Sequence, residues 1–387
     1  MPVWVLVIAR AVNRLGAFTL PFLGIVLTVE LGASLAEAGF VVTLFGLATI
    51  PSRLLGGHLA DRLGPKRTIV VGLVGCAVAQ LWIALAGSLW SAVVAVVLLG
   101  LVFEIYEPPS QAVIADVTEP AARPAAYGLL GAAVAAGAVL AGILAAALSH
   151  GSLRWLFVAD AVTCLACALL IAVALPRAST SLRQDGSRGG SGWRDRRLLL
   201  MLAAGTAFAT LYMQLMVGLP LTLLDRDLPA SAVGIVLAVS ALTLIAAQPL
   251  QRAARVRDLD DFQAMAIGYL LLGIGLLGNG FATTLPGFLA CTVIWSLGDL
   301  LLFSRTYTIV AALAPDKSRG RYMATYGLSW GIATTVAPVL GTQLLAAAGP
   351  TTLWTLCALV AFGLAGLQPA LRLRLNPLTL RPSELGG

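Results

Sequence analysis

A short polar segment between two apolar runs decides the fold of this chain. Residues 57–67 have the sequence GHLADRLGPKR, and the flanking apolar runs cover about 35–57 and 68–88. A helix needs about 20 mostly apolar residues to cross a bilayer, and each run is long enough. The segment between them holds three Lys or Arg side chains and is too short to form a domain. It therefore predicts a tight basic loop that joins two membrane-spanning helices.

The composition of the whole chain supports a membrane location. Of the 387 residues, 59% are apolar and 11% are charged, and the mean hydropathy is +0.92. Soluble domains have about 25% charged residues. A soluble fold of this composition would lack the polar surface needed to cover its apolar side chains. The composition therefore excludes a soluble enzyme, a nucleic-acid-binding module and a disordered protein.

Twelve apolar runs follow one another in two sets of six. The first set covers about 4–30, 35–57, 68–88, 91–114, 125–148 and 153–175, and the second covers about 198–223, 232–250, 263–282, 286–310, 322–348 and 351–371. Between the sets lies a stretch rich in Gly, Ser and Arg, which is typical of a flexible linker. We therefore predict an all-α membrane protein with 12 transmembrane helices. Its parts are an N-terminal six-helix bundle (1–175), a linker (176–197) and a C-terminal six-helix bundle with a short tail (198–387).

The distribution of basic residues predicts the orientation in the membrane. If the N-terminus is cytoplasmic, the outside loops hold only Arg154 and Arg226, which leaves the other 23 of the 25 basic residues elsewhere. The excess of Lys and Arg lies in the cytoplasmic loops of membrane proteins. We therefore expect a multi-pass protein of the inner (cytoplasmic) cell membrane, with both termini in the cytoplasm and an uncleaved first helix.

An internal repeat supports the division into halves. Residues 104–127 align with residues 299–322 at a constant offset, with Glu104 opposite Asp299. Each stretch covers the end of a fourth helix, a short loop and the start of a fifth helix. Duplicated halves around a site near the bilayer midplane are typical of secondary transporters.

The loop at residues 57–67 resembles the GxLaDrxGrkr signature of the major facilitator superfamily, at the position where that family carries it. The resemblance covers nearly the whole chain. It implies two pseudo-symmetric six-helix bundles with alternating access around a central cavity. Pro65 stands where the family usually has a basic residue, so the charge relay of the loop would use Arg62 or Lys66. An ordinary basic cytoplasmic loop is the alternative interpretation.

Each residue type in this loop has a physical role. Glycine permits close helix approach at Gly57 and a tight turn at Gly64. The negative charge of Asp61 suits the N-terminus of a helix from the other half. The basic side chains can meet carboxylates or lipid phosphates. The predicted gating motif of the loop comprises Gly57, Asp61, Arg62, Gly64, Lys66 and Arg67.

Two further segments resemble the multidrug-efflux branch of this family. Residues 106–116, YEPPSQAVIAD, look like its fourth helix, in which the aspartate matching Asp116 joins the gating charges of the loop. Residues 137–142 occupy the place of the gxxxGPxxGG motif of antiporters, with Ala138 instead of the proline, whereas residues 337–341 keep a proline. Small residues there allow tight helix contact, and generic helix packing is the alternative. The basic proton-coupling motif of the fourth helix is absent, and acids occupy its range.

Two acids on the fourth apolar run are the main proton-coupling candidates. Glu104 and Glu107 are three residues apart, which places both on one face of a helix. Burial and a like-charged neighbour disfavour ionised carboxyls, so one of the two is expected to hold a proton near neutral pH. The proline pair at 108–109 should free backbone carbonyls and kink the helix. The alternative is that one acid pairs with a basic residue such as Arg14 or Arg305.

Other ionisable residues within the apolar runs are secondary candidates, because such residues are costly in a membrane and usually functional. Asp299 is the second-half counterpart of Glu104. Glu30, near the end of the first run, is a further proton or cation contact, with a solvated loop residue as the default alternative. Asp160 is expected to have a structural role in the sixth helix.

A few polar residues inside the runs are candidates for lining the substrate cavity, although each is individually more often a packing residue. They are Asn13, Arg14, Gln111, Tyr212, Gln214, Trp295, Arg305 and Tyr307. Sugar carriers need many hydrogen-bonding groups, so this sparse set suits an amphiphilic or largely apolar small molecule better. For Arg14 the alternative is snorkelling to the lipid head groups.

The sequence indicates a transporter and not an enzyme. The two histidines lie in or near loops, and no Ser-His-Asp triad or metal site can be assembled from them. We predict a secondary active transporter, most plainly a monomeric proton-coupled efflux pump for amphiphilic drugs. The proton gradient would supply its energy without a cofactor, and its partners would be the substrate, protons and membrane lipids, with no nucleic acid. The alternative is a carrier of the same fold, importer or exporter, for one specific metabolite.

Overall fold

The computed structural model describes residues 8–9, 12–13, 19–106, 109–110, 123–175, 195–252, 259–313 and 319–375. For residues 53, 54, 57, 61, 123–135, 251, 252, 304, 311, 312, 319–321, 323 and 324 it describes the backbone alone. Within these ranges every regular element is a helix. The prediction of an all-helical protein is therefore confirmed.

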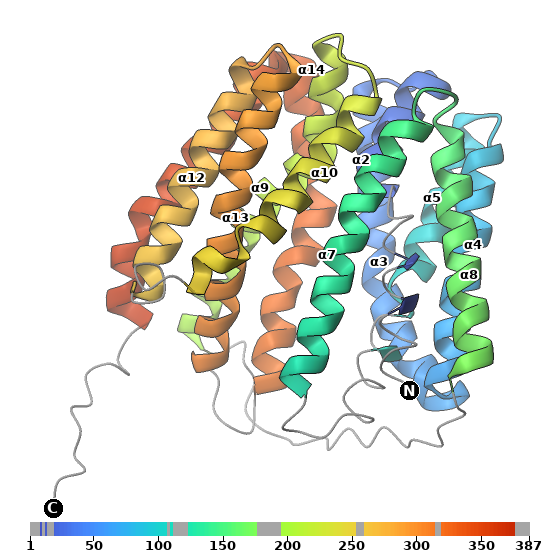
Figure 1. Cartoon of the computed structure of the whole chain (residues 1–387), viewed down its shortest axis with the longest axis horizontal. Helices are drawn as coiled ribbons and strands as arrows, with labels where there is room; N and C mark the ends of the chain where they lie inside the picture. The colour runs from blue at the N-terminus through green and yellow to red at the C-terminus, as the bar shows by residue number, and fades with distance from the viewer. Residues whose placement is uncertain are drawn as a thin grey trace, which may run out of the picture. The chain divides into compact units, whose positions relative to one another are not determined.

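The helices follow the order of the apolar runs (Figure 1). The first-half elements are α2 (Thr19–Ile25), the π-helix η1 (Val26–Glu30), α3 (Leu35–Leu63), α4 (Pro65–Leu85), α5 (Leu89–Phe103), α7 (Arg123–Leu148) and α8 (Arg154–Ala174). The second-half elements are α9 (Arg196–Asp225), α10 (Ser231–Ala246), the 3-10 helix η4 (Gln248–Arg252), α12 (Asp261–Phe281), α13 (Leu285–Leu313) and α14 (Arg319–Leu375). α14 is kinked at Gly349, whose φ of 75° and ψ of 175° are not helical.

Eight of the described helices are long and apolar enough to cross a membrane. They are α3, α4, α8, α9, α10, α12, α13 and α14. Shorter apolar helical stretches cover Thr19–Glu30, Leu89–Phe103 and Ala136–Leu148. The chain is thus a multi-pass membrane protein, as the composition predicts.

The turn between α3 and α4 is shorter than the predicted loop, because α3 continues to Leu63 and α4 begins at Pro65, which leaves only Gly64 between the two helices. Gly64 ends α3 and precedes α4 with φ 79° and ψ 156°, a conformation that favours glycine. Pro65 follows as the first residue of α4. Proline suits this position because the first helical N–H has no partner inside the helix. The departure from the family signature at Pro65 therefore has a structural reason, which is the start of α4.

The described chain divides into two compact units. The first comprises residues 1–185, 213–242 and 334–347, and the second comprises residues 186–212, 243–333 and 348–387. Both α9 and α14 therefore contribute residues to each unit. The division of the sequence into two bundles at a linker of residues 176–197 stays a prediction.

In the first unit, α4 packs against α8, α5 and α3, and α5 also packs against α3 (Figure 1). Ile69 and Leu73 of α4 form a buried apolar cluster with Cys167 and Ile171 of α8. Side chains of this size exclude water from the interior of the first unit.

Second-half segments of the first unit also pack against first-half helices, with glycines at the contacts. A Cβ atom on Gly142 of α7 would lie 2.5 Å from the backbone nitrogen of Ala238 in α10. A Cβ on Gly234 of α10 would lie 2.3 Å from the backbone nitrogen of Ala146 in α7. Real Cβ atoms do not approach so closely, so only glycine fits at these two positions. The tight helix contact expected for residues 137–142 is therefore present in the structure.

The second unit is organised around the pair α12 and α13, which run side by side (Figure 1). A Cβ atom on Gly298 of α13 would lie 2.5 Å from the backbone oxygen of Gly268 in α12. A Cβ on Gly275 of α12 would lie 2.7 Å from the Cβ of Trp295 in α13. Because both helices carry glycines along this seam, their backbones approach closely. The close contact determines which face of α13 is turned toward α12.

Candidate substrate and proton sites

The fourth helix is interrupted at Glu104. α5 ends at Phe103, and residues 104–106 form a turn. Proline lacks a backbone N–H, and its ring collides with the carbonyl four residues earlier. Four residues before the proline pair 108–109 lie Glu104 and Ile105. The structure thus shows the interruption that the prolines predict, a few residues ahead of the prolines themselves.

Neighbouring helices pack directly against this interruption. The backbone N–H of Glu104 donates a hydrogen bond to Ser52 Oγ of α3 at 2.9 Å. A Cβ atom on Gly56 of α3 would lie 2.6 Å from the backbone oxygen of Ile105, and one on Gly72 of α4 would lie 3.1 Å from the backbone nitrogen of Tyr106. The polar backbone of the turn is therefore enclosed by α3 and α4, which satisfies the requirement that backbone groups be covered in a membrane.

A buried carboxylate joins three helices beside the first apolar run. Asp160 of α8 is 4% exposed, and its Oδ2 accepts hydrogen bonds from Thr19 Oγ1 of α2 at 3.1 Å and from Gln80 Nε2 of α4. Gln80 Nε2 also donates to Thr19 Oγ1 at 3.0 Å. Because the carboxylate is bonded to other helices, this geometry favours the structural role expected for Asp160.

The cavity candidate Asn13 belongs to the same polar cluster. Its Nδ2 lies 3.5 Å from the sulfur of Cys164, and its Oδ1 accepts a hydrogen bond from the hydroxyl of Tyr106 at 3.2 Å. The Cys164 sulfur in turn lies 3.8 Å from Oδ1 of Asp160. The polar groups of Asn13 are therefore engaged with neighbouring helices, in a network that sequence reasoning did not assemble because its members lie in separate runs.

The secondary candidate Glu30 is engaged at the end of η1. Its Oε1 accepts hydrogen bonds from Ser152 Oγ and from the backbone N–H of Leu153, both at 3.0 Å. Its Oε2 lies 3.5 Å from Nε of Arg154. These bonds hold the end of η1 to the turn that precedes α8, and they give the carboxylate a structural partner on each oxygen.

Asp299 of α13 is in a different situation. The residue is 3% exposed, and its Oδ1 atom has no hydrogen-bond partner within the described residues. An ionised carboxyl with an unbonded oxygen is costly in an apolar interior. Arg305, on the same helix, forms a 2.7 Å ion pair with Asp261 at the start of α12. A buried carboxyl with a free oxygen is the kind of group that can take up and release a proton.

Aromatic side chains gather along α13 toward its C-terminal end. The Phe303 ring stacks on those of Tyr307 and Trp330, with ring centroids 6.5 Å and 5.6 Å away. Tyr212 of α9 meets Phe303 and Trp330 edge to face, at 5.9 Å and 5.3 Å. Tyr307 is 38% exposed. These four residues, which we call the aromatic cluster, form a partly open wall of rings in the second unit.

The aromatic cluster contains two cavity candidates and two residues that sequence reasoning missed. Tyr212 and Tyr307 are among the polar cavity candidates of the sequence. Phe303 and Trp330 are not, because an aromatic residue in an apolar run is usually a packing residue. The available signal was spacing, since Asp299, Phe303 and Tyr307 recur every four residues and share one helix face.

Two further cavity candidates, Gln214 and Trp295, are buried. Gln214 of α9 is 3% exposed, and its Nε2 donates a hydrogen bond to the backbone oxygen of Ala337 at 2.7 Å. Trp295 is 2% exposed, and its Nε1 has no hydrogen-bond partner within the described residues. Gln214 therefore lies at a helix contact, whereas Trp295 is held in the seam between α12 and α13.

The predicted gating loop is described in part. Arg62 and Arg67 are exposed, and Nζ of Lys66 donates a hydrogen bond to the backbone oxygen of Leu175 at the end of α8. Of Gly57 and Asp61 the structure describes the backbone alone, and the residues Arg14, Glu107, Gln111 and Asp116 lie outside the described part of the structure. Among the described residues there is no group of three His, Cys, Asp or Glu side chains that could hold a metal ion.

The fold and these buried polar groups define a multi-pass α-helical membrane protein built like a transporter. A family model described as Major Facilitator Superfamily matches residues 6–257 and 260–386. The chain therefore belongs to the major facilitator superfamily. It is a membrane transporter and not an enzyme, as the sequence predicts.

Individual relatives support the family and indicate a branch. The chain is 28% identical over 323 residues to a protein of Klebsiella pneumoniae named multidrug resistance protein MdtH, covering 82% of this chain and 80% of the relative. It is 25% identical over 356 residues to the protein of the same name from Salmonella typhimurium, covering 90% and 88%. It is also 24% identical over 338 residues to YqjV of Bacillus subtilis, named an uncharacterized MFS-type transporter, covering 84% and 82%. The similarity is consistent with the multidrug branch of the family.

Solved structures of transporters share the fold. A crystal structure of the peptide transporter POT matches with a TM-score of 0.81 at 16% identity, covering 96% of this chain and 94% of that one. A POT family transporter in complex with 5-aminolevulinic acid matches with a TM-score of 0.80 at 14% identity, covering 97% and 96%. At these identities the likeness concerns the fold alone.

Proposed function

We propose that this protein exports small amphiphilic compounds from the cell in exchange for protons, by alternating access. The observation that carries the proposal is the face of α13 on which Asp299 is followed by Phe303 and Tyr307. The rings offer an apolar, polarisable surface to a flat or cationic substrate, since aromatic faces attract cations. The buried carboxyl on the same face offers a site for a proton. The relatives named multidrug resistance protein support this class of substrate.

We further propose the architecture that such a mechanism needs. Twelve spans in two six-helix bundles would place both termini in the cytoplasm of a cell whose inner membrane holds the protein. The kink of α14 at Gly349 supports two spans within that helix, and the shorter stretches α2 with η1, α5 and α7 supply further spans. When α7 and α10 move apart at Gly142 and Gly234, the protein would open between these two helices.

Proton coupling is proposed for two carboxyls. Asp299 would hold a proton while its surroundings are closed to water and release it when water or a cationic substrate reaches its Oδ1 atom. Glu107 is the first candidate from the sequence, and its side chain lies outside the described residues. Glu104, at the interruption of the fourth helix, would change the proton affinity of Glu107 through the repulsion between two carboxylates. The proton gradient would then supply the energy, with no cofactor.

Transport by everted membrane vesicles tests the proposal. Vesicles with the intact protein should accumulate a fluorescent lipophilic cation when an inward-acid pH gradient is imposed. Asp299→Asn keeps the size of the side chain but cannot exchange a proton, so gradient-driven accumulation should be lost while dye binding persists. Glu107→Gln should have the same effect if both acids carry the proton. Asp225→Asn, which changes an exposed acid at the end of α9, is the matched control.

The results separate the proposal from its rival. Undiminished, pH-dependent accumulation by Asp299→Asn would remove that residue from the coupling site. If no lipophilic cation accumulates under any gradient, export of amphiphilic compounds is wrong, and a carrier for one specific metabolite becomes the better account.

A further inference from the structure

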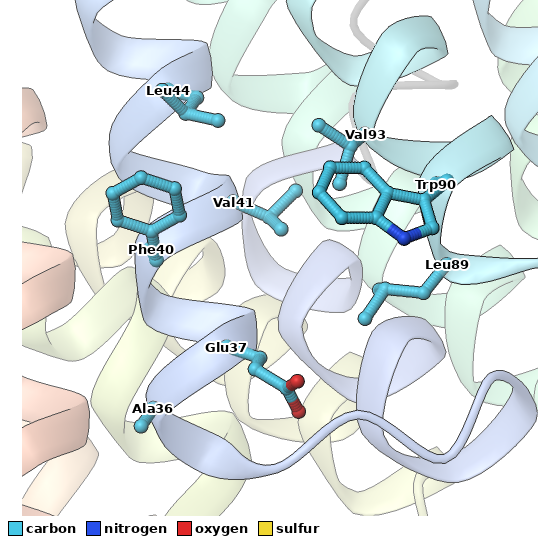
Figure 2. A pocket seen from close by; sticks show the side chains of 8 residues that line it. All are labelled: Ala36, Glu37, Phe40, Val41, Leu44, Leu89, Trp90 and Val93. Carbon is cyan, nitrogen blue, oxygen red and sulfur yellow. The ribbon is translucent and has the colours of Figure 1, made fainter.

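An apolar pocket lies between the first turns of α3 and α5, in the first unit. Its volume is about 370 Å³, and Figure 2 shows the side chains that line it. The lining residues are Ala36, Glu37, Phe40, Val41, Leu44, Leu89, Trp90 and Val93. Phe40 is 58% exposed and Trp90 is 80% exposed. Exposed apolar side chains at this place on membrane-spanning helices suit contact with lipid.

The pocket is polar at one end and apolar at the other. In Figure 2 the carboxylate of Glu37 and the indole nitrogen of Trp90 lie toward the same end, and Leu44 and Val93 line the opposite end. α3 begins at Leu35 and α5 begins at Leu89, so the polar end lies where both helices enter the membrane. Tryptophan is enriched at this depth, at the level of the lipid head groups. Leu44 lies seven residues further along α3 than Glu37, or about 10 Å deeper at 1.5 Å per residue.

The carboxylate of Glu37 is held in place with one oxygen available. Its Oε2 accepts hydrogen bonds from the backbone N–H and the hydroxyl of Ser34, both at 2.8 Å, in a capping box that starts α3. No hydrogen bond to Oε1 is formed by any described residue. The pocket therefore presents a fixed negative charge and an indole N–H donor toward the same end, with apolar side chains lining the other end.

We propose that this pocket binds a phospholipid whose head group carries a primary ammonium, such as phosphatidylethanolamine. The ammonium would donate to Glu37 Oε1, and the indole N–H of Trp90 would donate to a phosphate or ester oxygen. One acyl chain would lie along Val41, Leu44 and Val93. An anionic head group would be repelled by Glu37, and a choline head group has no N–H to donate to the carboxylate. The proposal is independent of the transported substrate.

Lipid titration of the purified full-length protein tests this assignment. Phosphatidylethanolamine, phosphatidylcholine and phosphatidylglycerol with identical acyl chains are added to delipidated protein, and bound lipid is counted by native mass spectrometry. The intact protein should bind phosphatidylethanolamine more tightly than the other two. Glu37→Gln should weaken phosphatidylethanolamine binding by about threefold and abolish its preference over phosphatidylcholine. Glutamine can take the place of glutamate in a capping box, so α3 should still begin normally.

Three further variants make the result specific. Trp90→Phe keeps an aromatic ring but removes the N–H donor, and it should weaken binding of all three lipids. Leu44→Trp fills the apolar end without changing charge, and it should lower phosphatidylethanolamine binding. Asp227→Asn removes an exposed carboxylate from the turn between α9 and α10, and it should change nothing.

Two results would overturn the proposal. The first is an unchanged preference for phosphatidylethanolamine in Glu37→Gln, or a preference of the intact protein for phosphatidylglycerol. The second is displacement of bound phosphatidylethanolamine by a lipophilic cation such as ethidium, with slower transport of that cation by Glu37→Gln. That outcome would make the pocket an entry site for substrate instead of a lipid site. Because binding is measured without a gradient, failure of the export mechanism would leave the lipid result unaffected.

Discussion

At the scale of single residues, the carboxylate of Asp160 holds three helices together, so its replacement should affect stability. Asp160→Ala removes the acceptor of the Thr19 hydroxyl and one of the two acceptors of Gln80 Nε2. Unsatisfied buried polar groups cost about 1–3 kcal/mol, so the free energy of unfolding should fall by about that amount. Asp160→Asn keeps one acceptor oxygen and should cost less. The measurement is denaturant or thermal unfolding of the purified protein in detergent.

A second threonine supplies the control for this experiment. The hydroxyl of Thr210 donates to the backbone oxygen of Thr206 in its own helix, so Thr210→Ala should leave stability nearly unchanged. If Asp160→Ala unfolds at the same denaturant concentration as the intact protein, the network is not a structural tie. In that case the carboxylate would have to be considered for transport.

At the scale of helices, the contact between α7 and α10 leaves no room for a side chain at Gly142. Gly142→Ala would place a Cβ 2.5 Å from the backbone nitrogen of Ala238, so the two helices must move apart. Overpacking costs about 1–3 kcal/mol, which shifts a two-state equilibrium by about five- to 150-fold. Spin labels at His150 and Asp227, in the turns after α7 and α9, should report a larger population of long distances. Transport should slow accordingly.

The matched control for this change lies in α14. Gly363 has no atom within 4 Å of the position that a Cβ would take, so Gly363→Ala should leave the distance distribution and transport unchanged. If Gly142→Ala leaves the distances between the spin labels at His150 and Asp227 unchanged, the contact does not control the separation of α7 and α10.

The helices and their turns could be predicted from the sequence, whereas the partners of each helix face could not. Apolar length sets where spans occur, and Gly64 and the prolines at 108–109 act through local backbone rules, so the tight turn and the interruption at Glu104 were predictable. Which side chain meets Asp160, or that Phe303 stacks on Trp330, depends on the packing of segments far apart in sequence. Polar residues inside apolar runs mark candidates, but their rotation about the helix decides whether they face a cavity or a neighbour.

At the scale of the whole molecule, the orientation in the membrane is testable because basic residues are distributed so unevenly. If the termini are cytoplasmic, Ser187→Cys in the linker should react with a membrane-impermeant maleimide only after the cells are opened. Asp225→Cys, at the end of α9, should react in intact cells. Four of the five native cysteines, Cys76, Cys164, Cys167 and Cys357, are buried and should add little background, and labelling of the partly exposed Cys291 is measured in the parent protein. Labelling of Ser187→Cys in intact cells would show that the predicted orientation is wrong. The pocket at Glu37 would then lie in the cytoplasmic leaflet, and the proposed direction of proton release would be reversed.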